Sequence, residues 1–411
     1  MVALLSLPLV ASILALSHAI VVDAAAAPAT DGAVHTDHVF TGFDKLGRLG
    51  LALPAHGVSG HPSGPASAAA SRRERRNVEL EDRAYNPKVK RATGANYYSA
   101  LVAIGASYTD NAHSRDGKYA DSLRHYYPYD KYSGRYSNGE VAVEYMVKSD
   151  ISPALKQQKS GVKLIDYAYG GSVVQNGLSG TSASWPAAKD QIVTYLSDLE
   201  SGRISVGTGR VLHYFNSGIN PVSQIWNNAI GQGMSATSIS NAKAAITANS
   251  KAAAEAMRSI NKNSKAVGSM HGVDYLLVGI PQMELVPTFG YQIPSSFSQT
   301  QRVQALALIK TLGDQWNAEL RSFAASFKSE TRANGSRVFY YDLAALWRSL
   351  HSSPRTSGIT VAPTTTTCYN SSTGGVCGNP QNYLYFDTLH PVTSVHKLMA
   401  QKMNALVLGT A

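Results

Sequence analysis

The chain has 411 residues, of which 44% are hydrophobic and 16% are charged, and its formal net charge is +10. This length and apolar content suffice for one large domain with a sizeable core and exclude a wholly disordered chain. The positive charge favours anionic surfaces such as acidic polysaccharide, but dispersed Lys and Arg usually form a solvated surface. The sequence contains no nucleic-acid motif, so we expect no nucleic-acid partner.

The N-terminus begins with an apolar stretch from Val2 to Leu16, followed by small residues at Ser17 and Ala19. This pattern predicts a secretory signal peptide over residues 1–19, although the stretch has no Lys or Arg before it. A membrane anchor or a buried helix is the alternative, but the run is short for a bilayer span. We therefore expect a secreted, extracellular protein without stable membrane insertion.

Residues 20–91 are rich in Ala, Gly, Pro, Ser and His, a composition that buries little apolar surface. They contain a basic cluster at residues 72–76 and end at the dibasic pair Lys90-Arg91. We interpret residues 20–91 as a low-complexity propeptide that a kexin-like processing protease removes after Arg91. The basic cluster fits a solvated charge run equally well.

From residue 92 onward, short apolar runs alternate with longer helical patterns. We predict strands at residues 100–104, 162–166, 210–216, 274–280 and 337–342, and helices at 139–148, 187–200, 238–264, 298–328 and 393–408. Such alternation is typical of a doubly wound α/β domain, in which helices flank a mainly parallel five-stranded sheet.

The two cysteines, Cys368 and Cys377, lie nine residues apart in a loop rich in Thr, Ser and Gly. In a secreted chain this spacing predicts one small-loop disulfide, which would pin the segment before Asp387, and it offers too few ligands for a metal site. Asn334 and Asn370 each begin an Asn-x-Ser pattern and are candidate glycosylation acceptors, although this pattern often arises by chance.

Chemically useful residues follow the predicted strands, at the edge of a parallel sheet where active sites gather. The stretches are Gly105-Ala106-Ser107, Gly170-Gly171-Ser172, Asn216 to Asn220, and Phe386-Asp387-Thr388-Leu389-His390. Together they hold a nucleophile, a carboxylate, an imidazole and donors for an oxyanion.

These four blocks, with YFDTLHPVTSVHKLMA at residues 385–400 as the most specific, resemble the GDSL or SGNH hydrolases. The segment GRYSNGEVAVEYM at residues 134–146 is similar to a stretch of the secreted fungal esterases of that group, the acetylesterases and lipase-like acylhydrolases. The resemblance implies that residues 92–411 are a catalytic domain with the flavodoxin-like SGNH hydrolase fold. It also implies an esterase that needs no cofactor and no metal.

The resemblance implies a role for each matching position. Ser107 would be the nucleophile, His390 the general base, and Asp387 the group that orients His390. The backbone N–H groups of Ser107 and Gly171 and the side-chain amide of Asn220 would stabilise the oxyanion. In isolation, Ser107 also fits a helix cap and Asp387 a cap beside a surface His.

Three positions depart from the family pattern, which usually has Asp at Ala106, Asn at Asp166 and Asp at Pro221. Because Ala106 lacks the carboxylate of the family pattern, we expect either a more loosely positioned serine or a lower negative charge near it. Pro221 is expected to restrict Asn220 to extended conformations and so to re-aim its amide. A catalytically impaired relative that binds carbohydrate is therefore an alternative to an active esterase.

The resemblance to fungal esterases implies a small-molecule or oligosaccharide substrate that carries acetyl or short acyl esters, with a lipase-like or lysophospholipase-like activity as the alternative. The Tyr-rich stretch at residues 124–132 fits either stacking on sugar rings or packing over the domain. Trp185 and Trp226 fit either an acyl pocket or the core. We expect a monomer.

Overall fold

The computed structural model describes residues 98–112, 114–115, 118–119, 134–148, 161–180, 185–207, 209–263 and 272–409. The predicted signal peptide (1–19), the predicted propeptide (20–91) with its Lys90-Arg91 site, and the Tyr-rich stretch (124–132) lie outside the described residues.

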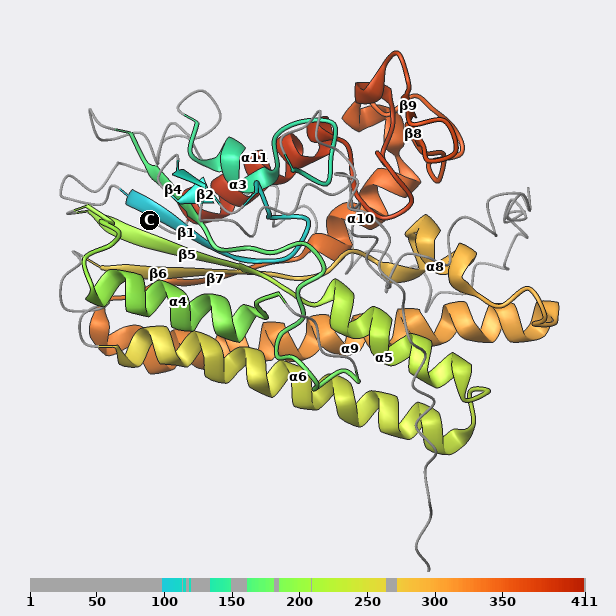
Figure 1. The fold of residues 1–411 in the computed structure, drawn as a ribbon, viewed down its shortest axis with the longest axis horizontal. Helices are drawn as coiled ribbons and strands as arrows, with labels where there is room; N and C mark the ends of the chain where they lie inside the picture. The colour runs from blue at the N-terminus through green and yellow to red at the C-terminus, as the bar shows by residue number, and fades with distance from the viewer. Residues whose placement is uncertain are drawn as a thin grey trace, which may run out of the picture. The chain divides into compact units, whose positions relative to one another are not determined.

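The core of the fold is a sheet with five parallel strands in the order β4-β1-β5-β6-β7 (Figure 1). Their bounds are β1 (Tyr98–Gly105), β4 (Lys163–Asp166), β5 (Arg210–Asn216), β6 (Val273–Val278) and β7 (Val338–Tyr341). Two short antiparallel strands, β2 (Ser114–Arg115) and β3 (Lys118–Tyr119), extend the sheet beyond β4. Every residue of β1, β5 and β6 is buried, as expected for strands covered on both faces. The α/β prediction with five parallel strands is confirmed.

Helices cover both faces of the sheet (Figure 1). One face carries α4 (Ala188–Glu200), α5 (Ile219–Gly231), α6 (Ala236–Lys262) and α9 (Gln299–Thr331), and the other carries α3 (Ala142–Met146) and α11 (Thr393–Gly409). Polar side chains start several helices: Ser298 caps α9 by accepting from the Gln301 N–H, and Asp342 caps α10 (Leu343–Ser352) by accepting from the Ala345 N–H.

The remaining elements are short and lie in connections. They are η2 (Met283–Leu285), α8 (Pro287–Gln292), η3 (Arg332–Asn334), η4 (Pro354–Ser357), η5 (Pro380–Asn382) and the hairpin β8 (Tyr369–Asn370) and β9 (Gly375–Val376).

The order of the strands determines where a site can form. β1 pairs with β4 on one side and with β5 on the other, so the connections leaving β1 and β4 diverge at their carboxyl ends. Open α/β sheets bind their ligands at such a switch point. The stretches after β1, β4 and β5 therefore meet at one place.

A buried ionic cluster ties the opposite, amino ends of the strands together. Asp274 at the start of β6 has a fully buried side chain, and it accepts hydrogen bonds from Arg210, Arg337 and the Tyr98 hydroxyl. Burial opposes ionisation of Asp274, but the hydrogen bonds and charges of the two guanidinium groups hold its pKa below its usual range. The cluster fixes β1, β5, β6 and the residue before β7 to one another.

The structure corrects the expectation for Pro221 in the segment after β5. α5 begins at Ile219, so Asn220 lies in the first turn of a helix rather than in a loop. Pro221 stands in the same first turn, where a backbone N–H has no partner within the helix, so proline costs no hydrogen bond there. The prediction that Pro221 holds Asn220 in an extended conformation is wrong.

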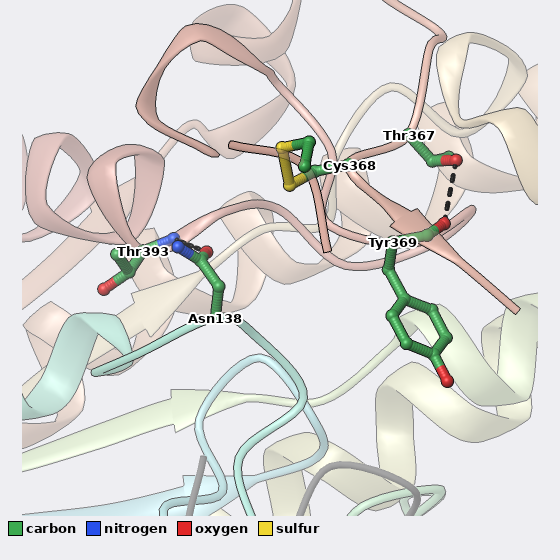
Figure 2. Close-up of a disulfide and its surroundings, with 6 residues drawn as sticks. Asn138, Thr367, Cys368, Tyr369 and Thr393 are labelled. Atoms are coloured by element: carbon green, nitrogen blue, oxygen red, sulfur yellow. Dashed lines mark hydrogen bonds between the residues drawn. A yellow bond between two sulfur atoms is a disulfide. The ribbon is translucent and has the colours of Figure 1, made fainter. Parts of the chain in front are cut away.

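The predicted disulfide is confirmed: Cys368 and Cys377 are joined with an S–S distance of 2.02 Å (Figure 2). Beside it, the N–H groups of Cys368 and Tyr369 donate to the carbonyls of Tyr385 and Phe386, the two residues before Asp387. The disulfide loop therefore pins the approach to Asp387.

The two candidate glycosylation acceptors lie at the surface. Asn334 ends η3 and Asn370 ends β8, and both side chains are exposed. Among the helices of the described residues, none combines the length and the apolar character that a bilayer crossing requires.

Candidate active site

Ser107 lies in a tight turn directly after β1. The Ala106 carbonyl accepts from the N–H groups of Thr109 and Asp110, at 2.8 and 2.9 Å, and so closes the turn around the serine. Gly105 permits this turn because a Cβ there would lie 2.5 Å from the Asn216 carbonyl oxygen. Ser107 is 6% exposed, and Ala106, where the family resemblance leads us to expect Asp, is also buried at 7% exposure.

Ser107, His390 and Asp387 form one continuous chain of hydrogen bonds. His390 Nε2 lies 2.8 Å from Ser107 Oγ, and His390 Nδ1 lies 2.8 Å from Asp387 Oδ2. The serine and the histidine are separated by 283 positions in the sequence, yet their side chains meet at the carboxyl edge of the sheet. The three residues predicted from the strand-end stretches are thus brought together.

The turn that carries Asp387 and His390 is held by its own backbone. Asp387 Oδ1 accepts from the N–H groups of Leu389 (2.8 Å) and His390 (2.7 Å), and the Phe386 N–H donates to the His390 carbonyl. Burial opposes ionisation of Asp387, but the charge and hydrogen bond of His390, with these backbone donors, keep its pKa below the usual range. Asp387 is therefore an anion that favours the proton of His390 on Nδ1.

Two aromatic rings enclose the imidazole of His390. The Tyr136 ring lies 5.1 Å from it, centroid to centroid, and the Tyr108 ring lies 5.8 Å from it. The Tyr108 hydroxyl also donates to the Leu389 carbonyl at 2.7 Å, which joins the nucleophile turn to the turn that carries His390. A close approach of two rings to one imidazole restricts its rotation.

The segment containing Tyr136 continues into a second clamp on the same turn. Ser137 Oγ donates to the Pro391 carbonyl at 2.9 Å, and Asn138 Oδ1 accepts from the Thr393 N–H, the first residue of α11, at 2.9 Å (Figure 2). The Thr393 hydroxyl in turn donates to the Glu140 carbonyl. The sequence block at residues 134–146 thus holds the start of α11 beside the site.

Three N–H donors follow the adjacent strands β1, β4 and β5. The N–H groups of Ser107 and Gly171 meet no recorded acceptor in the described part of the chain. The N–H of Gly170 instead donates to Asp110 Oδ2 at 2.7 Å, so Gly171 is the glycine that has a donor to offer. Gly171 takes a φ of +75°, a conformation that favours glycine. The Asn220 amide donates to the Ser172 carbonyl at 2.9 Å, which places it against the Gly171 loop.

Two buried carboxyl groups hold the nucleophile turn and the loop after β4 through hydrogen bonds to their backbone N–H groups. Asp110 joins the nucleophile turn to Gly170, as above, and Asp166 accepts from the Asn111 N–H on one oxygen and from the Ala168 N–H on the other. An Asn at position 166, which the family resemblance leads us to expect, would offer one acceptor oxygen, whereas Asp offers one oxygen to each of these two donors. Burial and the nearby Asp110 raise the pKa of Asp166 well above its usual value.

The two tryptophans differ in their surroundings. Trp226 is fully buried, donates to the Ala305 carbonyl and packs edge-on against Phe289, so it belongs to the core rather than to an acyl pocket. Trp185 is only half-buried, and its indole lies 3.1 Å from the point where a Cβ on Gly171 would stand.

His396 is a buried histidine near the start of α11. It is fully buried one turn into the helix, and its ring meets the edge of Tyr108 at a centroid distance of 5.9 Å. Burial and the neighbouring His390 lower its pKa to about 3, so it is a neutral packing residue. Among the described residues, no three His, Cys, Asp or Glu side chains are arranged to hold a metal ion.

A parallel α/β sheet that joins a serine, a histidine and an aspartate at its carboxyl edge has the arrangement of a serine hydrolase. Residues 101–403 match the family described as "GDSL-like Lipase/Acylhydrolase", and the chain belongs to this family. It is therefore a carboxylic ester hydrolase with GDSL-type acylhydrolase activity.

Two solved structures resemble this chain over 75% of its length and 99% of their own. One is the extracellular lipase from Streptomyces rimosus, at 16% identity and a TM-score of 0.34. The other is phospholipase A1 from Streptomyces albidoflavus NA297, at 12% identity and a TM-score of 0.34. A comparison with curated proteins gives no match. Similarity at this level carries no argument about the substrate.

Proposed function

We propose that this chain is a secreted serine esterase that removes acetyl or short-chain acyl groups from carbohydrate. The observation that carries the catalytic part is the unbroken chain from Ser107 Oγ through His390 to Asp387, with 2.8 Å at each link. Distances of this size allow His390 to take a proton from the serine without a rearrangement.

In the proposed reaction, Ser107 Oγ attacks the ester carbonyl while His390 Nε2 takes its proton. The tetrahedral intermediate collapses as its C–O bond to the alcohol breaks, and His390 gives the proton to the departing oxygen. Water then enters, loses a proton to His390 and attacks the acyl-enzyme, which releases the acid and restores Ser107. Asp387 stabilises the imidazolium that forms in both halves of the reaction.

The oxyanion of each tetrahedral intermediate would be held by the N–H groups of Ser107 and Gly171 and by the Asn220 amide. Asn220 Nδ2 carries two hydrogens, and the one recorded bond, to Ser172, uses one of them. Removing a single donor of this kind typically costs about 10² to 10³ in rate.

The choice of acetyl or short acyl esters on carbohydrate rests on the resemblance of residues 134–146 and 385–400 to secreted fungal esterases. A lipase-like or lysophospholipase-like activity is the alternative within the family. A catalytically impaired member of the family that binds carbohydrate is the alternative to an active enzyme, although the helical position of Asn220 removes the argument from Pro221. Signal cleavage, removal of residues 20–91, a monomeric state, and glycosylation at Asn334 and Asn370 complete the proposal.

Hydrolysis of p-nitrophenyl acetate by the processed protein and by its Ser107→Ala variant tests the catalytic part. We expect turnover by the unchanged protein and loss of almost all of it in the variant. Equal rates for the two proteins, or no rate above buffer, would rule out the esterase. A series of p-nitrophenyl esters from acetyl to decanoyl, together with acetylated xylan, then separates the substrate classes.

A further inference from the structure

Gln191, on the inward face of α4, makes an unusual set of contacts with the end of β1. Its side chain is 1% exposed. Its Oε1 accepts from the Gly105 N–H at 2.9 Å, and its Nε2 donates to the Gly105 carbonyl at 3.0 Å. The amide thus pairs with Gly105 as a neighbouring strand would, two residues before the nucleophile.

The same amide reaches the loop after β4. Gln191 Nε2 lies 3.0 Å from Ser172 Oγ and can donate to it, because the Ser172 hydroxyl itself donates to the Pro186 carbonyl at 3.0 Å. Ser172 follows Gly171 directly, and its carbonyl accepts the amide of Asn220. One buried side chain therefore connects the segments that carry Ser107 and Gly171, and Ser172 extends this connection to Asn220.

The contacts also leave little room for these segments to shift. Gly105 is wedged between the Asn216 carbonyl, at the end of β5, and Thr109 in the nucleophile turn. The Tyr169 N–H, from the loop after β4, donates to the Gly105 carbonyl as well. Removing the Gln191 amide would therefore displace the loop that contains Gly171 and Ser172 more than the Gly105 backbone.

We infer that Gln191 is a positioning residue for the oxyanion hole, which sets the spacing between the nucleophile turn and the donors at Gly171 and Asn220. The inference rests on the proposed function. It predicts a specific kinetic effect, because donors that are misplaced by a fraction of an ångström weaken the transition state more than the bound substrate.

The test uses Gln191→Met, which keeps the volume of the side chain and removes its hydrogen bonds. We expect kcat for p-nitrophenyl acetate to fall about 10- to 100-fold, with KM within about twofold of the unchanged protein. Affinity for an arylboronic acid, which forms a tetrahedral adduct on a reactive serine, is expected to fall in the same proportion as kcat.

Asn317→Leu is the matched control. Asn317, on α9, pairs with Ile280 after β6 in the same way, with its Oδ1 accepting from the N–H at 2.8 Å and its Nδ2 donating to the carbonyl at 3.0 Å. It is similarly buried, but none of the proposed oxyanion donors lies in that loop. We expect it to lower the melting temperature while kcat stays within about threefold of the unchanged protein.

A second variant tests the same connection in case Gln191→Met does not fold. Ser172→Ala removes the acceptor that Gln191 uses in the oxyanion loop, and we expect a smaller fall in kcat with little change in KM. In the double variant the two losses should not add, since both break one connection.

Three results would overturn the inference: an unchanged kcat in both Gln191→Met and Ser172→Ala, additive losses in the double variant, or an equal loss of kcat in Asn317→Leu. The catalytic part of the proposed function fails separately, because it fails when the unchanged protein shows no Ser107-dependent turnover.

Discussion

For Asp387→Asn, the structure predicts a large loss of catalytic activity with little change in the fold. Asp387 Oδ1 accepts the backbone N–H groups of Leu389 and His390, and an Asn oxygen can keep both bonds. The amide nitrogen then takes the place of Oδ2, 2.8 Å from His390 Nδ1. His390 Nδ1 also lies 3.0 Å from Asp387 Oδ1, but that oxygen already accepts two backbone N–H groups. The new amide donor therefore favours the tautomer in which Nδ1 accepts.

A neutral imidazole that accepts at Nδ1 carries its proton on Nε2, the atom that lies 2.8 Å from Ser107 Oγ. In this tautomer His390 cannot take the proton of the serine. The equivalent change in another serine hydrolase lowers kcat by about 10⁴, which corresponds to about 5.4 kcal/mol of lost transition-state stabilisation. We expect a loss of this size here, with a melting temperature within a few degrees of the unchanged protein.

Steady-state hydrolysis of p-nitrophenyl acetate and thermal unfolding measure the two quantities. Asp342→Asn is the control, because Asp342 also accepts a backbone N–H, at the start of α10. A loss in kcat below tenfold for Asp387→Asn would contradict the assignment of Asp387 as the group that orients His390. So would an equal loss in the control.

The remaining predictions concern stability and pH. Tyr108→Phe leaves the buried Leu389 carbonyl without its hydrogen-bond donor. We expect the unfolding free energy, measured in urea, to fall by about 1–3 kcal/mol and kcat to fall as well. Unchanged values for both would show that this hydrogen bond does not hold the His390 turn. Asp274→Asn leaves two guanidinium groups without their anion and is expected to cost about 3–5 kcal/mol at pH 7. The pKa of Asp274 is lower in the folded state than in the unfolded state. Its contribution to folding stability is therefore complete above the unfolded pKa of about 3.9 and is lost as the pH falls through the lower folded value. If the difference in melting temperature between variant and unchanged protein persisted in stronger acid, this assignment would be contradicted. Replacing Cys368 and Cys377 by Ser should lower unfolding free energy by about 2.5–3 kcal/mol, measured with the unchanged protein under the same non-reducing conditions.

The strands were predictable because each is a short apolar run that ends at glycine or a polar residue. β5 has the predicted bounds, and the other four parallel strands differ by one or two residues at an end. α5 was not predicted, since Gly218-Ile219-Asn220-Pro221 has the composition of a turn. Only the buried apolar face of the helix, which includes Val222 and Trp226, overrides that local preference.

For the site, the strand-end rule located the residues that the structure brings together, but not those that hold them. Ser107, Asp387 and His390 stand in recognisable blocks, and a parallel sheet collects such blocks at one edge. Tyr136 and Gln191 act through contacts between segments far apart in the chain. Tyr136 lies in the recognised block at residues 134–146, but that block does not indicate which residue it contacts, and no pattern in the sequence marks Gln191. Asp110 lies only three residues after Ser107, so a contact between Asp110 and the loops around the nucleophile could have been predicted from the sequence.

The separation of 283 residues between Ser107 and His390 has a consequence for how activity appears during folding. The sheet and its long helices can form from contacts that do not involve the last segment of the chain. The reacting pair exists only once the turn before α11 has docked against Tyr108 and Asn138. Contacts of such long range are slow to form, so catalytic competence should arise last in refolding, after the secondary structure is complete. The rate at which ester hydrolysis appears during refolding would then report the rate of the final docking step.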